Sequence, residues 1–212
     1  MKLRIIILLL LLVAILNSCY KIDTKKVQQF SRDQQLLIMD AENNSPMRVF
    51  KINKPNDSLI LRTICEDVVP DSTDKILDRL IKRMYATVRD SINDGVGIAA
   101  PQVGITKNII WVQRFDKAGE PFEVYLNPKI LQYSILAQTR REGCLSIPDR
   151  RDTLQSRSYA ILLEHINFKN ERKMEMIEGF TAIIFQHEID HLNGILFTDY
   201  VGKKPESSIL PN

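Results

Sequence analysis

Residues 179–193 have the sequence GFTAIIFQHEIDHLN. The first half of this stretch is apolar on nearly every side of a helix, and Gly194 follows where the helix would end. A helix without a polar face must be covered by other elements, so we predict a buried helix over residues 179–193. Its apolar residues are Phe180, Ala182, Ile183, Ile184 and Phe185.

The second half of this predicted helix carries His187, Glu188 and His191. Side chains four residues apart share one helical face, so both imidazoles can bind one metal ion. Glu188 would lie beside that ion and act as general base and then as general acid. Two ordinary helical histidines are the alternative, which we disfavour because burying these polar groups without a ligand costs desolvation energy.

A metal on this helix needs a third ligand. A histidine is missing where the extended zincin pattern would have it, at Phe197, and the downstream glutamate of a thermolysin-like site is offered only by Glu206 in the polar tail. His165 lies within a predicted strand. Cys144 is the best remaining candidate, because a thiolate and two imidazoles leave one position of a tetrahedral metal open. Cys65 is expected to be an ordinary buried residue.

Residues 95–104 have the sequence GVGIAAPQVG. Small residues permit the close approach of a ligand to the backbone, and Gln102 adds an amide that can donate to an oxyanion. A dinucleotide-binding loop does not fit, because no strand is predicted before Gly95.

The remaining pattern predicts an α+β fold, with antiparallel sheets around the metal-binding helix. Apolar spacing predicts a helix over 71–90, capped by Ser72, Thr73 or Asp74. Alternating polar and apolar residues after this helix predict five strands, and a sixth is expected before the folded domain. Their predicted ranges are 47–52, 109–112, 122–126, 130–136, 159–168 and 173–177.

The N-terminus has the layout of a secretory leader. Lys2 and Arg4 precede an apolar run over 5–16, too short to span a bilayer, and the following Asn17-Ser18-Cys19 resembles a bacterial lipobox. We expect a leader over 1–18 and a lipid on Cys19, which would place the protein in the cell envelope. An uncleaved interfacial anchor or a misassigned start is the alternative, and would leave the protein cytoplasmic.

Beyond the leader, we expect a polar tether over 19–58, a folded domain over 59–201 and a polar tail over 202–212. The 212 residues carry a formal net charge of +3, and removing the leader takes away two positive charges. A nearly neutral body does not favour nucleic-acid binding. Three cysteines cannot form a disulfide framework.

Three segments, in this order, resemble those of peptide deformylases: the glycine-rich segment ending in Gln102, Glu-Gly-Cys-Leu-Ser at 142–146, and Gln-His-Glu at 186–188 with His191. The resemblance covers roughly 59–201. It implies the family's α+β fold, one divalent ion (Fe²⁺, with Zn²⁺ as the alternative), and hydrolysis of the formyl group of N-terminal formylmethionine by a metal-bound water, with release of formate.

The same resemblance assigns roles to individual residues. Cys144, His187 and His191 would hold the metal, Glu188 would be the acid/base, and Gln102 with the Leu145 N–H would stabilise the oxyanion. The remaining assignments concern substrate binding, by the backbone of Val96, Gly97 and Gly143, by Arg151 beside the downstream residues, and by Ile183 and Ile184 as candidates for the methionine pocket.

The expected partners are N-formylmethionyl peptides or nascent chains, with membrane attachment through the N-terminus, and the sequence implies no obligate protein partner. Two other functions remain open at this point. A zincin-like metallopeptidase would cleave unformylated peptides, and a non-catalytic envelope lipoprotein would keep the fold for binding alone.

Overall fold

A computed structural model of the protein describes residues 29–202. The predicted leader, Cys19 and all of the predicted tail except its first residue lie outside the described residues. No helix within the described part of the chain is long and apolar enough to cross a membrane.

Two antiparallel sheets form the framework. The larger sheet has the strand order β1-β2-β3-β6-β7, and β4 and β5 form a separate hairpin. The strands are β1 (Gly97–Ala99), β2 (Ile109–Gln113), β3 (Phe122–Tyr133), β4 (Ala137–Cys144), β5 (Ile147–Ser158), β6 (Ala160–Ile166) and β7 (Arg172–Glu178). The expected strand over 130–136 is the second half of β3, which continues to Tyr133.

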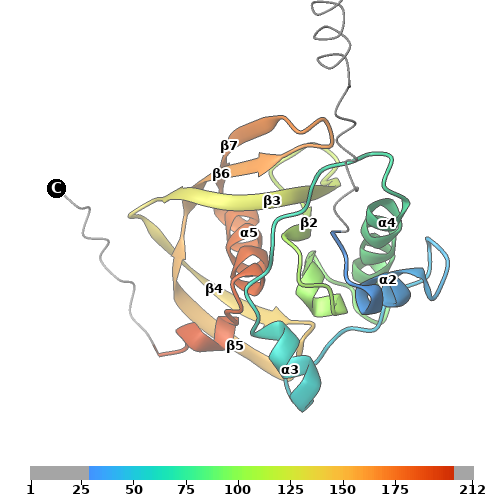
Figure 1. Ribbon diagram of the computed structural model, residues 1–212. Helices are drawn as coiled ribbons and strands as arrows, with labels where there is room; N and C mark the ends of the chain where they lie inside the picture. Colours follow the sequence, from blue (N-terminus) through green and yellow to red (C-terminus); the bar gives the residue numbers. More distant parts are fainter. Residues whose placement is uncertain (1–28, 203–212) are drawn as a thin grey trace, which may run out of the picture.

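Helix α5 (Gly179–Leu192) lies between the larger sheet and the β4–β5 hairpin, as Figure 1 shows. Its apolar side chains, among them Ala182, Ile184 and Phe185, pack with Ile110 and Leu163 of the sheet in one core cluster. Both the predicted helix and its burial are therefore confirmed, as is the α+β class.

A second core cluster covers the opposite face of β1 and β2, because successive strand residues point to opposite faces. Ile109 belongs to this cluster and Ile110 to the one around α5. Helices α2 (Arg32–Met39) and α4 (Lys75–Arg89) lie side by side here (Figure 1). Of the three candidate caps, Asp74 begins α4, since its carboxylate accepts the N–H groups of Ile76 and Leu77.

Residues 29–58 differ from the predicted tether. They contain α2 and the start of α3 (Pro55–Leu61), and Phe30, Ile38 and Met47 are buried in the second core cluster. A few apolar residues spaced among polar ones suffice to attach this segment to the domain.

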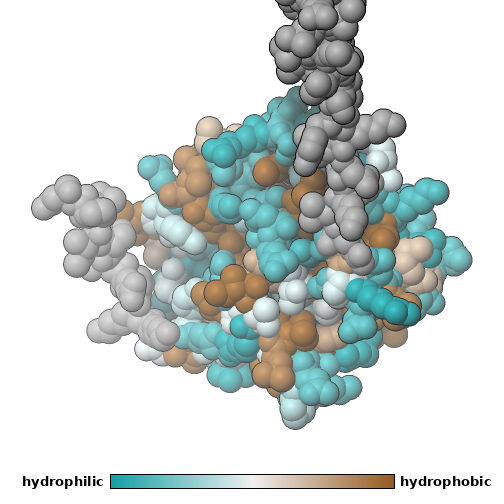
Figure 2. Space-filling model, in the orientation of Figure 1, coloured by the Kyte–Doolittle hydropathy of each residue, from teal (hydrophilic) through white to brown (hydrophobic). Residues whose placement is uncertain are grey.

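Residues 47–52 are not a strand, although their backbone is tied to the domain. The Phe50 N–H donates to the Gln102 carbonyl at 2.8 Å, and the Ile52 N–H donates to the Ser146 carbonyl at 2.9 Å. Gly104, with φ +87°, leaves room for Phe50, since a Cβ there would lie 2.5 Å from its ring. On the face of the molecule shown in Figure 2, apolar residues form separate groups among polar ones.

Candidate metal centre

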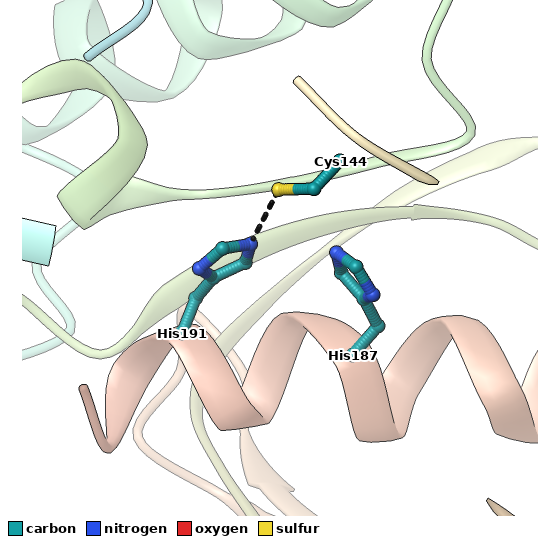
Figure 3. A group of neighbouring side chains, drawn as sticks. All are labelled: Cys144, His187 and His191. Atoms are coloured by element: carbon teal, nitrogen blue, oxygen red, sulfur yellow. Dashed lines mark hydrogen bonds between the residues drawn. The ribbon is translucent and has the colours of Figure 1, made fainter. Parts of the chain in front are cut away.

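The three predicted metal ligands converge. His187 and His191 rise from one face of α5, and Cys144, the last residue of β4, points toward them (Figure 3). The Cys144 Sγ lies 3.2 Å from the His191 Nε2. The three ligand atoms lie within 4.8 Å of one another. The fold thus brings Cys144 next to two histidines that lie 43 and 47 positions later in the sequence.

The donor set fits a divalent metal ion. A thiolate and two imidazoles suit Zn²⁺ and Fe²⁺, and three protein ligands leave a position open for a reactant. Burial alone would raise the pKa of Cys144, but the neighbouring charge of His191 and hydrogen bonds from both histidines lower it well below its ordinary value. A thiol that ionises readily is ready to bind a cation.

Behind the ligands, Glu142 orients His187. One carboxylate oxygen of Glu142 lies 2.8 Å from the His187 Nδ1, and Arg157 donates to both oxygens at 2.7 and 3.0 Å. Arg157 also donates to Asp190 at 2.6 Å, and Tyr200 donates to the other Asp190 oxygen at 3.0 Å. Such a carboxylate contact fixes the tautomer and orientation of a metal-binding histidine.

Sequence reasoning gave no role to Glu142 or Arg157. Glu142 was part of the quoted motif, and its carboxylate two residues before a candidate ligand was the only signal. Burial would raise the pKa of Glu142, but hydrogen bonds from His187 and Arg157, with the charge of Arg157, lower it to about 2. The carboxylate is thus ionised throughout the neutral range.

Glu188 lies beside the cluster and is 4% exposed. Its Oε2 is buried and, among the described residues, has no hydrogen-bond partner. Burial raises the pKa of Glu188 to about 7, against the opposing effect of His187 and His191. A carboxyl group that titrates near neutrality can both accept and return a proton.

Gln102 reaches the same centre from the 3₁₀ helix η1 (Ala100–Val103). Its Oε1 accepts the Ala99 N–H at 2.8 Å, so its Nε2 is directed toward Ser146 Oγ (3.2 Å) and Cys144 Sγ (3.6 Å). Leu145 follows Cys144 in the β4–β5 turn. The amide of Gln102 is therefore held with its donor side toward the cluster.

The predicted substrate-binding residues outside α5 lie on or next to strands β1, β4 and β5. β1 is an edge strand, and Gly97 at its start faces Glu188. Gly143 and Arg151 are paired across the β4–β5 hairpin. The Val96 side chain is 36% exposed, and its carbonyl already accepts the Gln113 N–H at 2.8 Å.

The two isoleucines proposed for a methionine pocket are both buried on α5. Ile184 packs in the core cluster, and its Cγ2 would lie 2.9 Å from a Cβ at Gly97, which places it beside the site. Ile183 is 3% exposed.

A family model described as Polypeptide deformylase matches residues 46–206. The chain belongs to the polypeptide deformylase family. It is 41% identical to peptide deformylase 1 of Clostridium perfringens over 148 residues, covering 68% of this chain and 93% of that protein. It is 35% identical to the peptide deformylase of Rhizobium meliloti over 153 residues, covering 71% and 84% of the two chains.

Solved structures of deformylases share the fold. The Met-Ala-Ser-bound class I type b peptide deformylase of Acinetobacter baumannii aligns with TM-score 0.65 and 34% identity, over 74% of this chain and 99% of that one. The Thermotoga maritima deformylase aligns with TM-score 0.63 and 34% identity, over 73% and 97%. The chain is therefore a deformylase enzyme that shares the fold of these structures.

Proposed function

We propose that this deformylase hydrolyses the formyl amide of N-terminal formylmethionine in peptides or nascent chains and releases formate. The observation that carries the proposal is the convergence of Cys144, His187 and His191 with a buried Glu188 whose pKa is about 7. Together they provide a metal-binding set and an acid/base group within one buried centre.

In this proposal, Cys144, His187 and His191 hold one divalent ion, Fe²⁺ or alternatively Zn²⁺. When bound, the ion supplies Lewis acidity toward the formyl carbonyl and toward water. Glu188 accepts the proton of the attacking water and delivers it to the departing amine nitrogen. Its burial supports this role, because a buried carboxylate favours taking up a proton.

Two donors would stabilise the negative charge that develops on the formyl oxygen, the Nε2 of Gln102 and the N–H of Leu145. The Ala99 N–H fixes the orientation of the Gln102 amide, so this donor needs no reorganisation during the reaction. A preorganised donor of this kind contributes about 2.7–4 kcal/mol to transition-state stabilisation.

We assign substrate binding to the open edge of β1 and to the β4–β5 hairpin. An extended peptide can add to a strand edge through backbone hydrogen bonds, here with Gly97, Gly143 and the N–H of Val96. Arg151 would lie beside the downstream residues. Ile183 and Ile184 would line the pocket for the methionine side chain.

The test is formate release from formyl-Met-Ala-Ser by protein loaded with Fe²⁺ or with Zn²⁺, with Glu188→Ala beside it and Glu178→Ala as the control. Glu178 is exposed at the end of β7, so we expect its variant to be active and Glu188→Ala to be inactive. Cleavage of the unformylated peptide would favour the metallopeptidase, and no turnover of either peptide would favour a binding protein. The more active of the two loaded forms identifies the functional metal.

We infer separately that the protein is attached to a membrane through a lipid on Cys19. The basic residues Lys2 and Arg4, the apolar run over 5–16 and the lipobox-like ending support this. Mass spectrometry of the mature N-terminus is the test. An acylated Cys19 is the expected result, and an intact Met1 would contradict it.

A further inference from the structure

Residues 50–52 form hydrogen bonds with both segments that carry the proposed oxyanion donors. The Phe50 N–H donates to the carbonyl of Gln102, and the Ile52 N–H donates to the carbonyl of Ser146. Between them, the Lys51 Nζ donates to the Leu145 carbonyl at 2.5 Å. A segment expected to be a tether therefore touches the backbone of both donor residues.

The contact of Lys51 is with a peptide group that also faces the metal site. In the Leu145–Ser146 peptide, the carbonyl accepts from Lys51 and the Ser146 N–H lies 3.4 Å from the Cys144 Sγ as its donor. A cation at the carbonyl draws electron density from the amide and strengthens its N–H as a donor. Lys51 thus acts on the thiolate through one peptide group.

Lys51 is itself held in place. Its backbone N–H donates to the carboxylate of Asp57 at 2.9 Å, and Arg48 donates to both oxygens of that carboxylate at 2.6 and 3.0 Å. Asp57 is only 4% exposed. The Lys51 side chain is part-buried, in contrast to the exposed Lys54 three residues later. A buried, paired anchor restricts the backbone from which the ammonium reaches Leu145.

We propose that Lys51 is a positioning residue of the deformylation reaction: its ammonium fixes the Leu145–Ser146 turn and, through it, the Leu145 N–H donor and the hydrogen bond to the Cys144 thiolate. The proposal rests on the roles given above to Cys144 and Leu145. Because the Leu145 N–H faces charge that develops in the transition state, loss of Lys51 should lower kcat more than it changes KM.

The variants that test this are Lys51→Met, which keeps the length but removes the cation, and Lys51→Arg, which keeps the cation. Lys54→Met is the matched control. Two quantities are measured, kcat and KM for formyl-Met-Ala-Ser, and the wavelength of the thiolate-to-cobalt charge-transfer band of the Co²⁺-loaded protein. The band reports the electron density on the Cys144 sulfur and does not depend on turnover.

We expect Lys51→Met to lower kcat about tenfold, as loss of an outer partner of a metal site typically does. Its charge-transfer band should move to longer wavelength, because a thiolate with a weaker hydrogen bond gives up charge more easily. Lys51→Arg should keep the wild-type band and recover most of kcat. Lys54→Met should match the wild type in both measurements.

A Lys51→Met protein with wild-type kcat and an unmoved band would overturn the proposal. If Lys51→Met does not fold, Lys51→Arg still decides, since a shifted band in that variant would contradict a role for the positive charge. A wild-type protein that binds Co²⁺ but releases no formate would instead reject the proposed function, while the band would still test the contact between Lys51 and the thiolate.

Discussion

The carboxylate of Glu142 lies 2.8 Å from the Nδ1 of His187, and this contact leaves Nε2 as the His187 nitrogen available to a metal ion. The same carboxylate is bound by Arg157 through two hydrogen bonds. The Glu142 side chain therefore couples the orientation of a proposed metal ligand to a buried ion pair.

The first prediction concerns Glu142 and acid stability. Its pKa of about 2 in the folded protein lies below the ordinary value of 4.5, so the carboxylate stabilises the fold above pH 4.5 and this contribution is lost as the pH falls to 2. The difference amounts to about 3 kcal/mol. Unfolding of the wild type and of Glu142→Gln by urea should therefore differ most at pH 6 and least near pH 2. A difference that does not change with pH would contradict the assignment.

The second prediction concerns Gly97. A Cβ at this position would lie 2.5 Å from the Glu188 Oε1 and 2.9 Å from the Ile184 Cγ2, so Gly97→Ala must displace Glu188, the proposed acid/base group. Misplacement of a catalytic group by about 1 Å can lower the rate about 100-fold, which is the loss of kcat we expect. Gly119→Ala is the control, because no atom lies within 4 Å of its Cβ position. Equal kcat values for the two variants would show that Glu188 tolerates the displacement.

The third prediction concerns the cysteines after removal of the metal by a chelator. The pKa of Cys144 is held well below its ordinary value, whereas burial raises the pKa of Cys65 to about 12. Iodoacetamide at pH 7 reacts with thiolates, so it should modify Cys144 and leave Cys65 intact. Peptide mapping by mass spectrometry identifies the modified residue. Reloading the metal first should protect Cys144, and equal labelling of the two residues would contradict the prediction.

The fourth prediction concerns Arg114, which is 2% exposed and lies outside the three motifs. It donates to Asp116 at 2.6 and 2.8 Å and to Glu175 at 2.9 Å. Arg114→Met removes the hydrogen bonds to Asp116 and Glu175, whose side chains are 29% and 27% exposed, and loss of hydrogen bonds to charged groups of this kind costs about 1.5–3 kcal/mol. Thermal and urea unfolding measure the loss. The exposed pair of Lys82 with Asp78 is the comparison, for which Lys82→Met should change stability by about 0.5 kcal/mol or less.

The features predicted correctly from sequence depend on short spacings. The helix over 179–193 and its two histidines follow from an apolar run and an i, i+4 pair, and the structure places α5 over Gly179–Leu192. The β4–β5 hairpin was not predicted, because residues 137–144 (AQTRREGC) carry charges on both faces of the strand. Its stability comes from pairing and from contacts with α5, which no local pattern reports.

The contacts made by residues 29–58 were missed for a related reason. Polar composition indicates a tether when it is averaged over many residues, whereas Phe30 and Ile38 are single anchors buried in the core. The role of Lys51 depends on a carbonyl 94 positions later in the chain. Tertiary structure decides which residues so far apart in sequence form a contact, and these contacts cannot be predicted from composition.

The burial of Phe30 also limits how far the folded domain could lie from a lipid on Cys19. If Cys19 carries a lipid, only the residues from 19 to 29 join the bilayer surface to the folded body. Fully extended, about ten residues reach at most about 36 Å. The catalytic centre would then work within roughly one protein diameter of the membrane, and its accessible substrates would be peptides whose N-termini emerge or diffuse along that surface.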